Sequence, residues 1–131
     1  MSRFRKKEKD IILNLERPNT IDVAALDKDD QTKLLLILAD GMDWHDEANH
    51  LLLLQEKLNN YIDYIESKQY LEKYQDASTI VIQIKFLFKE TDNCILFLEQ
   101  AVRFIETSLD NTKVEIEYGN QKTFPIENNN T

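Results

Sequence analysis

The sequence predicts an α+β fold, a two-layer sandwich in which two helices cover one face of a four-stranded mixed sheet. Residues 44–66 carry leucine and isoleucine at steps of three and four, which is the spacing of one helix face. Residues 78–88 alternate large apolar side chains with others, which is the period of a strand. The predicted elements follow the order β-β-α-β-α-β, and two amphipathic helices on one side of the sheet bury the most apolar surface.

The first two predicted strands form a hairpin. The segment TIDVAALD (20–27) alternates, and the polar turn KDDQ separates it from the apolar run TKLLLILA (32–39). Leucine is not a strong strand former, so the second strand is predicted from its length and from the hairpin context. Asp40 and Gly41 then favour a turn that takes the chain out of the sheet.

The helix over residues 44–66 is expected to begin among acidic side chains, which suit the positive end of a helix dipole. Asp43 is the expected N-cap. Four consecutive leucines, Leu51–Leu54, exceed one narrow stripe, so two sides of the first turns are expected to be covered. The solvent-facing side is predicted to consist of Gln55, Glu56, Lys57, Asn59, Asn60 and Asp63.

The strand at residues 78–88 has the strongest pattern in the chain. Its even-numbered positions, from Ile80 to Phe88, share the predicted buried face. Gln83 and Lys85 indicate that the opposite face is wet, as expected for a sheet with helices on one side only.

A second helix and a last strand complete the prediction. Thr91 or Asp92 is expected to cap a helix that reaches about Leu109. Cys94 falls on its apolar face, where a small buried thiol is expected. The alternating segment TKVEIEY (112–118) predicts the last strand.

We predict a single α+β domain at residues 19–119. A basic extension at residues 1–18 precedes it, and a disordered polar tail at residues 120–131 follows it. Pro18 disfavours a helical conformation at the preceding residue and marks the start of the domain.

The charge is unevenly distributed along the chain. The formal net charge is −8, but the first 17 residues carry a net of +3 and the remainder has ten basic against 21 acidic residues, a net of −11. An acidic body repels nucleic acid and attracts a basic protein surface, so the expected partner is another protein and not a nucleic acid. The single cysteine excludes an internal disulfide. No apolar run is long enough to span a membrane, and we predict a cytoplasmic location.

The densest polar cluster is DGMDWHDEANH, residues 40–50. Asp46 and His50 are four residues apart and share a helix face, so they are the candidate metal ligands. The alternative is that these acids serve the helix dipole, and we favour it, because the segment lacks the second histidine of the HExxH signature. We expect no metal, no cofactor, no catalytic residue and no enzymatic activity.

Protein contacts have two candidate locations. Trp44, the only tryptophan, is expected either to plug the junction between hairpin and helix or to anchor an interface together with Asp43 and Glu47. Apolar edge strands, either Leu34–Leu38 or Val114–Tyr118, are expected to allow pairing with a second copy in a homodimer.

The stretch from Asn19 to Tyr118 resembles a family of small, uncharacterised bacterial proteins known as a domain of unknown function. The resemblance lies in NTIDVAALDKDDQTKLLLILADGMDW and HLLLLQEKLNNYIDYIES, followed by a Tyr-rich turn and an alternating strand. It is most specific at residues 43–44 and 50–59. The resemblance implies the order of elements and an intracellular bacterial origin, and it implies no activity, ligand or catalytic residue.

The favoured hypothesis is a small acidic protein-interaction module without catalytic activity, for example an immunity- or antitoxin-type protein. One alternative is a metal- or small-ligand-binding protein or enzyme that uses Asp43, His45, Asp46 and His50. Another is an adaptor that binds an anionic surface through the basic residues of the N-terminal arm, between Arg3 and Lys9.

Overall fold

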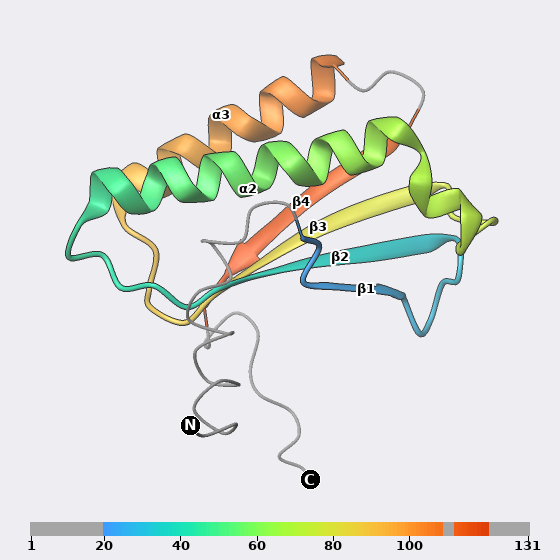
Figure 1. Cartoon of the computed structure of the whole chain (residues 1–131), viewed down its shortest axis with the longest axis horizontal. Coiled ribbons are helices and arrows are strands. Elements are labelled where there is room, and N and C mark those ends of the chain that lie inside the picture. The colour runs from blue at the N-terminus through green and yellow to red at the C-terminus, as the bar shows by residue number, and fades with distance from the viewer. Residues whose placement is uncertain (1–19, 109–111, 121–131) are drawn as a thin grey trace, which may run out of the picture.

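The computed structural model of the chain describes residues 20–108 and 112–120, and within them the predicted order β-β-α-β-α-β is confirmed. The predicted basic extension and most of the predicted tail lie outside the described residues. The two helices lie on one side of the sheet (Figure 1). The elements are β1 (Val23–Leu26), β2 (Lys33–Asp40), α2 (Glu47–Ser67), the 3-10 helix η2 (Gln69–Glu72), β3 (Thr79–Phe86), α3 (Asp92–Ser108) and β4 (Lys113–Gly119).

The sheet is mixed, with the strand order β1-β2-β3-β4. β1 pairs with β2 antiparallel as a hairpin, whereas β2, β3 and β4 are parallel neighbours joined through α2 and α3. The three parallel strands therefore end at one edge of the sheet, at Asp40, Phe86 and Gly119. The prediction that Leu34–Leu38 forms an edge strand is wrong, because β2 pairs on both of its sides. The two edge strands of the sheet are β1 and β4.

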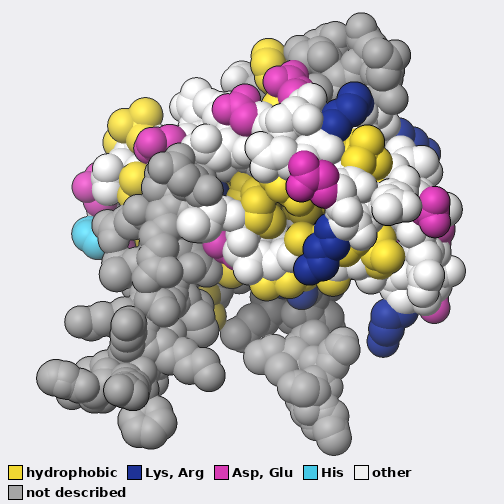
Figure 2. All heavy atoms as spheres, turned by 45° about the vertical axis from the view of Figure 1, so that its right-hand side comes forward, with side chains coloured by type: hydrophobic (Ala, Val, Ile, Leu, Met, Phe, Trp, Pro, Cys, Tyr) yellow, Lys and Arg dark blue, Asp and Glu magenta, His cyan; other side chains and the backbone are white. Residues whose placement is uncertain are grey.

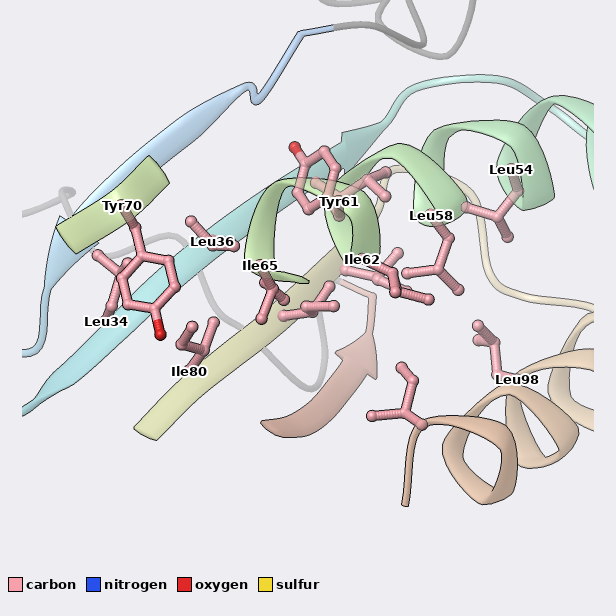
Figure 3. Packing of buried hydrophobic residues seen from close by; sticks show 14 of the residues in the cluster. Leu34, Leu36, Leu54, Leu58, Tyr61, Ile62, Ile65, Tyr70, Ile80 and Leu98 are labelled. Atoms are coloured by element: carbon pink, nitrogen blue, oxygen red, sulfur yellow. The ribbon is translucent and has the colours of Figure 1, made fainter. Parts of the chain in front are cut away.

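The core lies between the sheet and the helices (Figure 3). β2 and β3 each direct every second side chain toward the helices, and Leu34, Leu36, Ile80 and Ile82 are fully buried there. α2 covers them with its stripe of leucine, isoleucine and tyrosine, and Leu98 of α3 closes the same cluster. The spacing of the apolar residues thus specifies both layers.

The start of α2 differs from the prediction. The helix begins at Glu47, and its N-cap is Asp46, whose side chain accepts a hydrogen bond from the Asn49 backbone N–H (3.3 Å). Asp43 was the wrong candidate because its carboxylate is used within the preceding loop, where it accepts from the His45 N–H (3.1 Å). The helix ends at Ser67, and the capping residue that follows, Lys68, takes the left-handed conformation (φ 61°).

The prediction that Lys57 faces solvent is also wrong, because its side chain is fully buried. Position 57 follows Leu54 by three residues and precedes Tyr61 by four, so it belongs to the same helix face. The Lys57 ammonium forms an ion pair with Asp22 (2.6 Å), which lies just before β1 and whose side chain is 6% exposed.

Tyr61 completes this buried polar network. Its hydroxyl donates to the Ile37 carbonyl of β2 (2.7 Å) and accepts from the Asp22 N–H (2.9 Å). The Asp22 carboxylate also accepts from the Ala39 N–H (2.9 Å). The strand β1 begins opposite Ile37, so it leaves backbone groups of β2 near Ile37 and Ala39 without a strand partner. The Tyr61 and Asp22 side chains bind these groups and hold the segment before β1 against the sheet.

Charged side chains cover much of the remaining surface. On the side of the sheet away from the helices, Lys85 is exposed and Gln83 donates to the Glu117 carboxylate of β4 (3.0 Å). Figure 2 brings the side of η2 forward and shows hydrophobic side chains surfacing between acidic and basic ones. None of the helices within residues 20–108 and 112–120 combines the length and the hydropathy that a membrane-spanning segment needs.

Candidate functional site

The loops that follow β2 and β3 meet at the carboxyl edge of the parallel strands. Open α/β sheets bind ligands outside this edge where the strand order reverses, and here β2, β3 and β4 follow in chain order without a reversal. The loops themselves are therefore the place to look for a site. Two loops form it, residues 41–46 between β2 and α2 and residues 87–91 between β3 and α3. The predicted cluster at residues 40–50 lies here, together with side chains that the sequence pattern did not single out.

A buried pair, Asp40 and His50, ties the end of β2 to the first turns of α2. Asp40 follows Leu34, Leu36 and Leu38 at steps of two, so it points into the core, where its side chain is fully buried. His50 Nε2 lies 2.6 Å from Asp40 Oδ2. This spacing was the sequence signal that could have placed Asp40 on the buried face of β2. A buried carboxylate needs a partner, and His50 supplies it.

Both ring nitrogens of His50 are engaged. Nδ1 lies 2.9 Å from the Asp43 carbonyl oxygen, which can only accept, so Nδ1 carries a hydrogen and donates it. The short contact on the other side also needs a proton between Nε2 and the Asp40 carboxylate. A metal ion could therefore reach His50 only by displacing one of these two contacts.

Trp44 fills the space outside this pair. Its ring stacks on His50 at 3.6 Å between centroids and lies 6.0 Å from the ring of Phe86 at the end of β3. The indole Nε1–H donates to the Phe88 carbonyl (3.4 Å), which joins the two loops. Trp44 is only half-buried, so it packs against the core and also presents an edge to solvent.

The structure separates the two candidate metal ligands. Asp46 is exposed at the N-cap of α2, whereas His50 is buried and faces Asp40. Across the part of the chain that the structure describes, no three His, Cys, Asp or Glu side chains are grouped so as to hold a metal ion.

The other candidate residues lie at the surface and pair with their neighbours. Asp43 and His45 bond to each other through side chains, and this contact lowers the pKa of the Asp43 carboxyl and raises the pKa of the His45 imidazole. Hydrogen bonds from Thr91 and Asn93 lower the pKa of Glu47. The Asn93 bond (3.2 Å) links the start of α3 to the start of α2.

Two exposed apolar side chains belong to the loop after β3, whose Phe88 carbonyl accepts the Trp44 indole N–H. The prediction that Phe88 belongs to the buried face of the strand is wrong, because β3 ends at Phe86 and the Phe88 side chain is 44% exposed. Its neighbour Leu87 is 49% exposed, although its N–H still donates to the Asp40 carbonyl (2.9 Å). We call this region, made of Asp43, Trp44, Glu47, Leu87, Phe88 and Glu90, the strand-end surface.

Cys94, in the first turn of α3, is fully buried. Its backbone N–H donates to the Thr91 hydroxyl (3.1 Å), which caps the helix. Burial, together with the negative charges of Asp40, Glu90 and Glu47, raises the pKa of the thiol to about 12. A thiol of this kind stays protonated and is a poor nucleophile.

Comparison with known proteins places the chain in a family. Neither a curated protein nor a solved structure matches it. One family model does match, over residues 13–121, which is most of the chain and includes every described element. The chain belongs to the family described as Family of unknown function (DUF6572).

Proposed function

We propose that this protein is a small cytoplasmic module without catalytic activity, of the immunity or antitoxin type, that binds a basic protein through its strand-end surface. The observation that carries the proposal is the exposure of Leu87 and Phe88 in the loop whose Phe88 carbonyl accepts the Trp44 indole N–H. Apolar and aromatic side chains at the centre of a patch, with charges around them, are the usual anatomy of a protein interface.

The charges around this centre favour a basic partner. Asp43 and Glu90 belong to the same two loops and Glu47 opens α2, and the chain beyond residue 17 carries a net charge of −11. Such a field accelerates the approach of an oppositely charged protein and repels acidic ones. It also disfavours nucleic acid as a partner of this surface.

Three observations support a non-catalytic role. The Trp44 ring stacks on His50 and covers it at the carboxyl edge of the sheet. Both nitrogens of His50 are engaged in contacts with the protein itself. The Cys94 thiol is buried and protonated. His50 and Cys94, two of the groups that could serve acid, base or nucleophilic chemistry, are therefore committed to the fold.

Affinity purification with a matched set of variants tests the proposal. The tagged full-length chain is used to capture proteins from the organism that encodes it, in parallel with the double variant Leu87→Ser/Phe88→Ser. The control is Val23→Ser, which changes a side chain of similar exposure (48%) on the edge strand β1.

We expect the wild type and the Val23→Ser control to retain one basic protein that the double variant loses. Added salt should weaken its binding, because the attraction is partly electrostatic. A partner retained equally by all three proteins would contradict the assigned surface. Tight binding of a metal or metabolite with no protein partner would contradict the proposed function.

A further inference from the structure

A second apolar surface lies on the outer side of the helix layer, away from the strand-end surface. α2 and α3 run side by side there in the same direction (Figure 1). A groove of about 250 Å³ lies between them, and we call it the helix groove. All of its lining residues are uncharged: Gln55, Leu58, Asn59, Ile62, Phe97, Gln100, Ala101 and Phe104.

Three large apolar side chains are exposed on these two helices. Leu52 of α2 is 64% exposed, Leu96 of α3 is 57% exposed, and Phe104 of α3 is 56% exposed. They are more exposed than the apolar side chains of the strand-end surface. Phe104 lines the helix groove, and Leu52 and Leu96 lie on the same two helices outside its lining. Several exposed apolar side chains on one pair of helices mark an interaction surface more often than a single one does.

We propose that the helix groove is the interface of a symmetric homodimer, in which a second copy of this chain packs α3 against α3 about a two-fold axis at Gln100. This surface replaces the edge strands as the expected site of self-association. The inference does not depend on the proposed function, because it uses a different face of the molecule.

Charge identifies a second copy as the occupant. Two copies of a chain with a net charge of −8 repel each other, so they can associate most readily where neither presents charge. The lining of the helix groove meets this condition, and the exposed charges nearest Gln100 on α3, Glu99 and Arg103, are of opposite sign. The strand-end surface does not, because it carries Asp43, Glu47 and Glu90. A basic partner, in contrast, would gain nothing electrostatic from the helix groove.

The spacing along α3 suits two-fold symmetry. Leu96 and Phe104 lie four residues before and after Gln100, or about 6 Å in each direction along the helix axis. A rotation about Gln100 therefore brings Phe104 of one copy opposite Leu96 of the other. Each apolar side chain gains an apolar neighbour, and the two Gln100 amides can hydrogen-bond to each other.

The surface is large enough for a dimer. α3 has 17 residues, which is about 25 Å of helix, and two helices side by side are about 20 Å wide. The resulting footprint of roughly 500 Å² is a flat projection, and its accessible area is larger. It is of the same order as the roughly 800 Å² per partner of a standard interface.

Sedimentation of the full-length chain over a range of concentrations tests the proposal. We expect the wild type to sediment as a dimer. Phe104→Glu should raise its dissociation constant by at least about 100-fold, since each introduced carboxylate then faces the apolar Leu96 of the other copy. Val23→Glu, at an exposed apolar position on β1, and the strand-end double variant are expected to leave the dimer unchanged.

A cross-linking experiment tests the position of the axis. A residue on a two-fold axis meets its own copy, so Gln100→Cys is expected to form an intermolecular disulfide on mild oxidation. Gln75→Cys, an exposed position beyond η2, should not, and buried Cys94 should not interfere. A wild type that stays monomeric, a dimer that Phe104→Glu leaves intact, or a Gln100→Cys variant that fails to cross-link would each overturn the proposal.

Discussion

The buried ion pair between Lys57 and Asp22 gives the sharpest prediction about stability. Lys57→Met keeps a long unbranched side chain in the helix, so it removes the ammonium group without opening a large cavity. The Asp22 carboxylate, whose side chain is only 6% exposed, would then lose its partner at 2.6 Å. Breaking a buried pair in this way typically costs about 3–5 kcal/mol.

The structure places the expected loss at the lower end of that range. The second oxygen of Asp22 still accepts the Ala39 N–H at 2.9 Å, so only part of the carboxylate is left unsatisfied. We therefore expect Lys57→Met to lower the free energy of unfolding by about 3 kcal/mol. Glu56→Met, at the exposed neighbouring position, should change it by no more than about 0.5 kcal/mol.

Urea unfolding followed by circular dichroism measures these values, and a double-mutant cycle isolates the pair. Combining Lys57→Met with Asp22→Asn removes both charges, so the double variant should be more stable than the sum of the single changes predicts by at least about 1.5 kcal/mol. A loss below about 1 kcal/mol for Lys57→Met, or strictly additive effects, would show that the pair is not buried as described.

Four further predictions concern the core and the candidate site. Leu54→Ala should cost about 2–5 kcal/mol in urea unfolding, whereas Leu52→Ala, on the exposed side of the same helix, should cost no more than about 0.5 kcal/mol at low protein concentration. Because burial raises the pKa of the Cys94 thiol to about 12, iodoacetamide should modify it far more slowly in the native protein than in urea, and equal rates would contradict the burial. The thiol ionises near pH 9 in the unfolded chain, so the stability that comes from keeping it protonated in the fold is complete below pH 9 and is lost as the pH rises toward 12. The free energy of unfolding should therefore fall less over this range in Cys94→Ala than in the wild type, and unfolding at several pH values measures the difference. Asp43→Asn should lower the pKa of His45 toward its ordinary value in an NMR titration, and an unchanged pKa would exclude their contact.

The fold was predictable because its apolar periods are unambiguous. The steps of three and four in α2 and the alternation in β3 and β4 each indicated one buried face, and the observed layers follow from them. The parallel pairing of β2 with β3 and of β3 with β4 follows from the helices that connect them.

The polar interior was harder to predict. Lys57 was assigned to the solvent side because of its charge, although its position relative to Leu54 and Tyr61 places it on the buried face. Its partner Asp22 lies 35 residues away, and no local pattern links the two. The prediction thus followed the charge of Lys57 and not its spacing in the helix, whereas in the fold its ion pair with Asp22 allows the side chain to be buried.

The internal contacts of the candidate segment were not predicted. The segment 40–50 does lie at the carboxyl edge of the sheet, yet His50 turns inward to Asp40 and away from Asp46. The exposure of Phe88 was not predicted, because alternation alone does not show at which residue a strand ends. The strand stops two residues earlier, and the aromatic ring is exposed.

The most direct test of the proposed function is an NMR map of the bound surface. The labelled full-length protein is titrated with the purified basic partner, and the backbone amides are followed. We expect the perturbed amides to gather in residues 43–47 and 87–90, which contain the strand-end surface. Perturbations confined to the open face of the sheet, or the absence of any perturbation at Phe88 and its neighbours, would contradict the account.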